Sequence, residues 1–250
     1  LGDVYKRQST IVEAIRQGRA IFDNIRKFVL YLLSCNVSEI AVISIASVIN
    51  TPLPIKPLQI LFLNLVTDVF PALALGVSEG DPQIMQRKPR KRAEPIMRRN
   101  DWLSVVSYSM LITMSVLTAF GLSFSWLEKD TATAVTISFL TLAFAQLWHV
   151  FNMRSHQSHP IKNEVVQNLY VWGALLLCIL LLLAAIYIPG LANILQVTDP
   201  GLDGWALLLG MSLIPLLVGQ ILKQIEVPFL KLSNQNNLQK SLSQVKQGEK

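Results

Sequence analysis

The distribution of charge along this chain constrains its fold more than any other feature. Six long apolar segments alternate with charged ones, and of the 16 Asp and Glu residues only Glu39 and Asp68 lie inside the apolar segments. None of the 22 Lys and Arg residues does. A bilayer core requires roughly 20 mostly apolar residues per helix. The sequence therefore predicts an all-α, polytopic membrane bundle of six transmembrane helices, at about residues 28–49, 58–77, 102–124, 131–152, 168–188 and 204–222.

The basic residues predict how this bundle is oriented. Twenty of the 22 fall in segments on one side of the six spans, and only Lys56 and Lys129 fall on the other side. By the positive-inside rule the crowded side is cytoplasmic, so both termini are expected there. The basic run at 87–92 is interpreted as a topology signal that contacts lipid headgroups. The net charge of +6 then reflects topology and not nucleic-acid binding.

The two ends of the chain differ from its centre. Residues 1–8 fit nothing that follows and are interpreted as a possible sequencing artefact. A helical pattern starts at Ser9, and no proline interrupts it before Pro52. One helix over 9–49 would be about 60 Å long, with 9–27 as a cytoplasmic stalk that leads into the first span. An amphipathic helix lying on the membrane remains the alternative. Residues 223–250 form a polar cytoplasmic tail, which we expect to be disordered after Ile225.

Polar side chains inside the first two spans predict a cation site. Asn64, Thr67 and Asp68 fall at i, i+3 and i+4, so a helix presents them on one side. Asn36 and Glu39 share a face of the preceding span in the same way. A carboxylate inside a membrane marks an ion or proton pathway by default. Together the five residues form an all-oxygen set suited to a hard cation such as Ca²⁺.

Other readings of these polar residues stay open. Gln146 in the fourth span offers a further, weaker neutral ligand. A proton relay would need only the two carboxylates, and a polar patch between packed helices would need no ion at all. His149, His156 and His159 do not match a compact metal-ligand spacing and are interpreted as solvated loop histidines.

Two further residue types inside the spans have structural interpretations. Pro71, three residues after Asp68, removes a backbone donor and should kink the second span, either to line the site or for packing alone. Cys35 and Cys178 both fall within spans and are interpreted as packing residues.

Several ordered motifs resemble those of one family, the P-type cation-transporting ATPases. The resemblance covers about residues 9–222 and is closest to the calcium-pump branch, of a prokaryotic-like sort. It implies that the chain is the C-terminal membrane half of such a pump, and a fragment. The motifs are Gly18–Lys27, Tyr31–Glu39, Asn64–Asp68 with Pro71 and Ala72, Asp81–Met85 and Gln146–Ser155.

The resemblance implies a mechanism that this chain cannot perform alone. In the family, ATP phosphorylates an aspartate in a D-K-T-G motif, and the resulting cycle opens the cation site to alternate sides of the membrane. ATP and Mg²⁺ would act only through domains missing here, so the chain alone should be inactive as an ATPase. The resemblance also assigns ligand roles to Asn36, Glu39, Asn64, Thr67 and Asp68, with Ca²⁺ as the transported ion.

Three positions decide the expected ion and its number. Gln146 stands where two-calcium pumps carry a Glu, so one Ca²⁺ per cycle is expected. Sodium/potassium pumps carry Asp at the position of Asn64, and magnesium importers carry Tyr in place of Thr67. A Na⁺ or H⁺ pump of the same family remains an alternative, as does a membrane protein without a motor that binds cations or a partner. The resemblance implies the plasma membrane of a prokaryote, with the lipid bilayer, the cation and the missing N-terminal part of the pump as partners.

Overall fold

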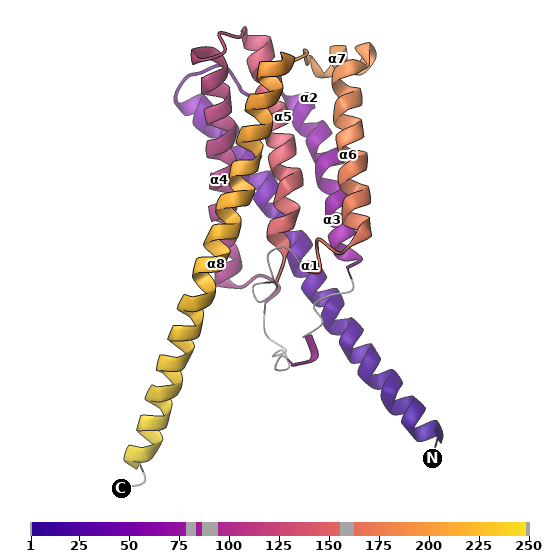
Figure 1. The fold of residues 1–250 in the computed structure, drawn as a ribbon, viewed down its shortest axis with the longest axis vertical. Helices are drawn as coiled ribbons and strands as arrows, with labels where there is room; N and C mark the ends of the chain where they lie inside the picture. The colour runs from indigo at the N-terminus through magenta and orange to yellow at the C-terminus, as the bar shows by residue number, and fades with distance from the viewer. Residues whose placement is uncertain (1, 79–83, 87–94, 156–162, 249–250) are drawn as a thin grey trace.

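The computed structural model describes the backbone of residues 2–78, 84–86, 95–155 and 163–248. Within these ranges it describes side chains from Thr10 to Gln224. Within these residues every regular element is helical. Six helices are long and apolar enough to cross a membrane, which confirms the predicted fold (Figure 1): Thr10–Val48, Pro57–Gly76, Arg99–Ser125, Thr131–Met153, Leu169–Tyr187 and Gly201–Gln224. The basic run at 87–92, together with His156 and His159, lies outside the described residues.

The first span is part of one continuous helix, α1 (Gly2–Val48). This supports the single stalk helix over the helix lying on the membrane, and it extends the helix through residues 2–8. The helix continues because no proline interrupts it. It ends where Asn50 adopts a left-handed backbone conformation with φ 55°. The first half of α1 leaves the bundle at the same end as the last helix (Figure 1).

The second span is broken into three pieces around the polar motif. An α-helical turn, α2 (Pro57–Leu63), runs into a π-helical turn, η1 (Asn64–Asp68), and then into α3 (Val69–Gly76). Pro71 has no N–H to give to the carbonyl of Thr67, four residues earlier. That carbonyl lies 3.2 Å from the Tyr31 hydroxyl, and the carbonyl of Val66 accepts a hydrogen bond from the Cys178 thiol at 3.2 Å. The kink predicted from Pro71 is therefore accompanied by a π-helical turn. Two backbone carbonyls of this turn accept hydrogen bonds from side chains on α1 and α6.

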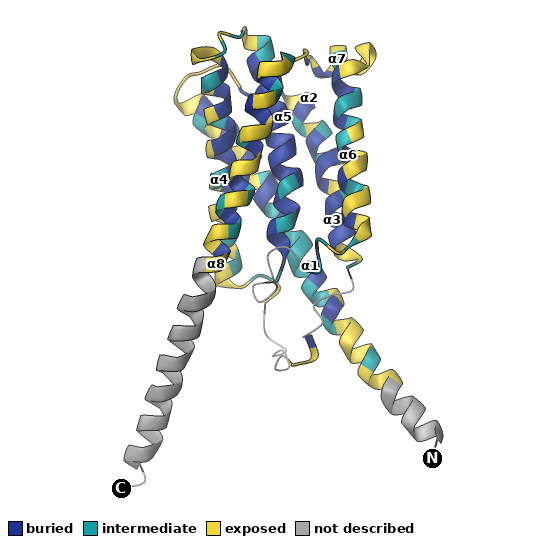
Figure 2. Cartoon of the chain, viewed as in Figure 1, coloured by how far each residue is buried: buried dark blue, intermediate teal, exposed yellow. Residues whose placement is uncertain are grey.

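The centre of the bundle is α5 (Thr131–His149), which continues into a 3₁₀ turn, η3 (Val150–Met153). Most of its side chains are buried, as the dark blue helix in Figure 2 shows. Asp130 begins the helix, because its carboxylate accepts a hydrogen bond from the backbone N–H of Ala132. Three helices surround α5 together with α1: α4 (Arg99–Ser125), α6 (Leu169–Tyr187) and α8 (Gly201–Gly248). A residue on α5 can therefore reach several spans.

Loop segments bind the base of α1 where it enters the bundle. The side-chain amide of Asn24 donates hydrogen bonds to the carbonyls of Gly76 and Ser78, at 3.2 and 2.6 Å, just after α3 ends. Arg19 donates to the carbonyl of Ile84 at 3.1 Å, in the short 3₁₀ turn η2 (Ile84–Gln86). These bonds connect the stalk to the chain that follows the second span.

A partly buried ion pair joins α1 to the segment between α5 and α6. Lys27 Nζ lies 2.8 Å from Glu164 Oε1, which also accepts the backbone N–H of Ser155 at 2.6 Å. Burial alone would raise the pKa of Glu164, but the ammonium group of Lys27 and the hydrogen bonds to the carboxylate lower that pKa from 4.5 to about 2. Glu164 is therefore charged in the folded protein at neutral pH.

The end of the bundle opposite the stalk carries an element that the sequence did not indicate. A short helix, α7 (Pro189–Leu195), follows α6 and ends at Gln196, whose φ is 53°.

The last helix, α8, continues to Gly248. This differs from the disorder expected after Ile225, because the polar residues there continue a helix that has already been nucleated in the last span.

A close approach of α8 to its neighbours depends on Gly219. A Cβ atom at this position would lie 2.7 Å from Asn152 Nδ2 and 2.9 Å from Tyr108 Cε1. Close by, Gln220 donates to Asn152 Oδ1 at 2.9 Å, and the buried ammonium group of Lys223 donates to the backbone carbonyl of Arg154 at 2.7 Å. The glycine therefore allows α8 to make these bonds to η3 and to the residue that follows it.

Candidate cation site

Four of the six predicted ligands are joined by direct hydrogen bonds. Glu39 on α1 accepts two of them, from Asn64 Nδ2 to Oε2 at 3.0 Å and from Gln146 Nε2 to Oε1 at 2.9 Å. The hydroxyl of Thr67 lies 3.3 Å from Gln146 Oε1. The structure thus brings together side chains of α1, η1 and α5 inside the membrane-spanning bundle.

Asp68 lies beside this network but outside its hydrogen bonds. The residue is 1% exposed, and neither carboxylate oxygen accepts a hydrogen bond of normal geometry; the donor that faces it is the thiol of Cys35 on α1, which is a weak one. The negative charge of Glu39 acts on the Asp68 carboxylate unfavourably. An ionised carboxylate in such surroundings is strongly disfavoured unless a proton or a cation neutralises it. Asp68 is therefore the group of this site with the greatest need for a positive ion.

Asn36 is the predicted ligand that the structure does not join to the others. Its side-chain amide donates to the carbonyl of Leu32 on its own helix, at 2.8 Å. No hydrogen bond among the described residues connects it to Glu39 or to η1. Its position one turn before Glu39 is as predicted, but the geometry gives it a weaker connection to the site.

The chemistry of these groups fits a hard cation. Carboxylate, amide and hydroxyl oxygens are the ligands that Ca²⁺ takes. The amide groups of Asn64 and Gln146 now present nitrogen to Glu39, and a rotation of each amide would present its oxygen instead. In the described part of the chain, no three His, Cys, Asp or Glu side chains lie close enough to hold a metal ion. The amide and hydroxyl oxygens would thus have to complete the set.

Sequence reasoning gave no role to Tyr31, which lies at the centre of this region. Its buried hydroxyl lies 3.2 Å from the backbone carbonyls of both Thr67 and Gln146. It can donate its one proton to either, so it connects α1 to η1 and α5 just beside the polar network. The spacing of Tyr31, Cys35 and Glu39 at i, i+4 and i+8 was a usable signal, because it places all three on one face of α1.

His149 contradicts the interpretation of the histidines as solvated. It is fully buried, its ring stacks on Tyr31 at 6.0 Å between centroids, and it meets the edge of Tyr108 at 4.7 Å. Its Nδ1 lies 3.3 Å from the amide nitrogen of Asn152. The error arose because His149 is near the end of its span, where α1 and α4 still cover α5.

Six apolar helices long enough to cross a membrane, with two carboxylates buried between them, define a polytopic membrane protein with a candidate ion site. Residues 52–225 match the family model described as the C-terminus of cation-transporting ATPases. The chain belongs to this family.

Three relatives show how much of a family member the chain represents. It is 44% identical over 216 residues to a calcium-transporting ATPase of Bacillus subtilis. That alignment covers 86% of this chain and 24% of the Bacillus protein. It is 35% identical over 230 residues to calcium-transporting ATPase 1 of Bacillus cereus, with 86% and 26% covered. The human calcium-transporting ATPase type 2C member 1 is 29% identical over 221 residues, with 87% and 24% covered. The chain thus spans about a quarter of the length of these relatives.

Proposed function

We propose that this chain is the part of an ATP-driven calcium pump that binds the transported ion within the membrane. The names of the relatives from both Bacillus species support calcium as the ion. The chemistry of the site supports it independently, because the groups that meet between α1, η1 and α5 can all offer oxygen.

A single observation carries this proposal. Asp68 is buried in a membrane-spanning segment with neither carboxylate oxygen accepting a hydrogen bond of normal geometry, beside a second carboxylate, Glu39. A structural polar patch would be expected to satisfy its members with hydrogen bonds. A carboxylate whose only facing donor among the described residues is a weak thiol favours a group whose partner is a transported ion.

The charge of the site supports a stoichiometry of one Ca²⁺ per cycle. Glu39 and Asp68 carry two negative charges, which neutralise one Ca²⁺. Asn36, Asn64, Thr67 and Gln146 would add neutral oxygens. Gln146 contributes no charge, so the residues of this chain would not compensate a second divalent ion in the low-dielectric interior.

The remaining parts of the pump would supply the chemistry. ATP and Mg²⁺ would act in domains outside this chain, and α1 would carry their movement to Glu39. With 20 of its 22 basic residues on one side, the chain would have both termini in the cytoplasm. The similarity to proteins of Bacillus species supports the plasma membrane of a prokaryote.

The test is Asp68→Asn in the complete pump, measured as Ca²⁺-dependent phosphorylation from ATP. We expect this variant to lose the phosphorylation, since the amide cannot neutralise the ion. Asp101→Asn is the matched control, because it makes the same change of carboxylate to amide outside the candidate site. Asp101 precedes the third predicted span and lies near Arg26. Unchanged calcium dependence in Asp68→Asn would remove Asp68 from the site. Phosphorylation of the unaltered pump with Na⁺ or protons alone would instead identify one of those ions as the substrate.

A further inference from the structure

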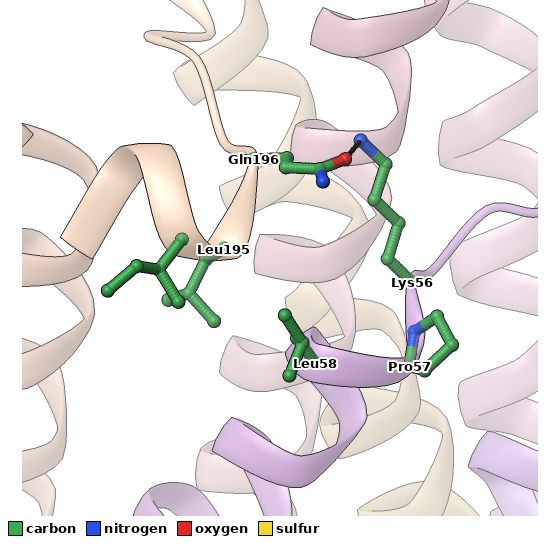
Figure 3. A pocket seen from close by; sticks show the side chains of 6 residues that line it. Lys56, Pro57, Leu58, Leu195 and Gln196 are labelled. Atoms are coloured by element: carbon green, nitrogen blue, oxygen red, sulfur yellow. Dashed lines mark hydrogen bonds between the residues drawn. The ribbon is translucent and has the colours of Figure 1, made fainter. Parts of the chain in front are cut away.

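A pocket of about 220 Å³ lies at the end of the bundle opposite the stalk, between the start of α2 and the end of α7 (Figures 1 and 3). It is separate from the cation site, which begins at η1, beyond α2. Six residues line it: Lys56, Pro57, Leu58, Ile194, Leu195 and Gln196.

Two hydrogen bonds hold the walls of this pocket together. Lys56 Nζ donates to Gln196 Oε1 at 2.7 Å, as Figure 3 shows. The fully buried Gln59 donates to the carbonyl of Leu195 at 3.0 Å, and its own side-chain oxygen accepts the backbone N–H of Lys56. The left-handed conformation of Gln196 ends α7 and turns the chain at this point. The pocket is therefore formed by two segments fixed relative to each other.

The lining combines an apolar surface with one positive charge. Four of the six lining residues are apolar, and Leu58 and Ile194 are 49% and 59% exposed. The charge is the ammonium group of Lys56, whose partner Gln196 is a neutral amide. A ligand that satisfies both features has an apolar chain and an anionic head.

The position of the pocket selects the kind of ligand. Pro57 is the first residue of the second candidate span, and α7 follows directly after the fifth, which ends at Tyr187. The pocket therefore lies at the level where acyl chains meet headgroups. Lysine side chains at this level bury their methylene groups and extend the ammonium group to the interface.

We propose that this pocket binds an acidic phospholipid. The ammonium group of Lys56 contacts the phosphate of the headgroup, and an acyl chain packs on Leu58 and Ile194. Binding requires neither ATP nor calcium, so this proposal stands apart from the transport function.

The experiment uses the complete pump in nanodiscs. The nanodiscs contain either phosphatidylglycerol or phosphatidylcholine, each with the same photoactivatable acyl chain. After irradiation, mass spectrometry measures labelling of residues 57–59 and 191–196. We expect phosphatidylglycerol to label these segments about fivefold more than phosphatidylcholine, which corresponds to ~1 kcal/mol for one lysine near an anionic headgroup. Equal labelling by the two lipids would overturn the proposal.

Two variants assign the effect to Lys56. Lys56→Gln should remove the fivefold preference, whereas Lys129→Gln, which changes the other lysine predicted on this side, should keep it. A preference that survives in Lys56→Gln, or is lost in Lys129→Gln, would refute the role of the ammonium group.

Discussion

The side-chain amide of Gln146 donates a hydrogen bond to Glu39 at 2.9 Å, from the last turn of α5 to the membrane-spanning part of α1. The same amide presents its oxygen to Thr67. A neutral side chain thus occupies one carboxylate oxygen of the candidate site. A carboxylate in its place would repel Glu39 unless a cation lay between them.

We therefore expect Gln146→Glu in the complete pump to raise transport from one Ca²⁺ to two per ATP. The added charge would compensate a second divalent ion. The measurement is calcium uptake into proteoliposomes against ATP hydrolysed in the same sample.

Gln146→Ala separates charge from hydrogen bonding. It removes the bond to Glu39 without adding a carboxylate, so the ratio should stay at one. A ratio of two in the unaltered pump would contradict the proposed role of Gln146.

The two carboxylates of the site should respond in opposite ways to the same substitution. Asp68→Asn removes a buried charge that accepts no hydrogen bond of normal geometry, so it should stabilise the chain in the presence of a chelator by about 1–3 kcal/mol. Glu39→Gln should destabilise it by about 1–3 kcal/mol, because the amide of Asn64 or Gln146 would have to rotate and lose its other hydrogen bond, to the carbonyl of Ile60 or from Thr67. Thermal unfolding in detergent measures both, and equal shifts of the same sign would contradict the described network.

The ion pair of Lys27 and Glu164 predicts a pH dependence of stability. The pKa of Glu164 is about 2 in the folded chain, against an ordinary value of 4.5 in an unfolded one. Since the folded pKa is the lower, the stabilisation by Glu164 is fully present above pH 4.5 and is lost as pH falls through about 2. The shift corresponds to roughly 3 kcal/mol at neutral pH.

Glu164→Gln should therefore flatten the unfolding free energy between about pH 5 and 2. Glu13→Gln is the control, because Glu13 pairs with Arg16 on an exposed surface of α1, where such pairs contribute at most about 1 kcal/mol. Equal effects of the two substitutions would show that the Lys27–Glu164 pair stabilises the protein no more than the exposed Glu13–Arg16 pair does.

Gly219 and Gly210 on α8 form a further matched pair. Gly219→Ala would press a methyl group against Asn152 and Tyr108, so we expect a loss of about 1–3 kcal/mol. Gly210→Ala meets no atom within 4 Å and should stabilise the helix by up to about 1 kcal/mol. Unfolding temperatures of the two variants that shift together would contradict this packing.

The fold followed from the sequence because its main determinant is local. A membrane-length apolar segment specifies a helix by itself, so six spans could be predicted without knowing their neighbours. Spacing also drew attention to Asn64, Thr67 and Asp68, of which Asn64 and Thr67 join the hydrogen bonds around Glu39 and Gln146 while Asp68 lies beside them. The inclusion of Gln146 drew on the family resemblance as well.

The parts that sequence could not supply depend on distant residues. The direction of the amide of Gln146 is fixed by Glu39, 107 positions away. The burial of His149 depends on Tyr31 and Tyr108, and the low pKa of Glu164 depends on Lys27. No window of a helical repeat contains these pairs, so they appear only once the spans are packed.

The proline of the second span has a consequence for how the spans can move. Pro71 offers no competing N–H to the carbonyl of Thr67, and the phenol of Tyr31 approaches that carbonyl from α1. The connection is thus to the main chain of η1 and does not depend on which side chains the turn carries. A displacement of α1 at Tyr31 would therefore shift the backbone of Thr67 and Asp68, whatever their side chains bind.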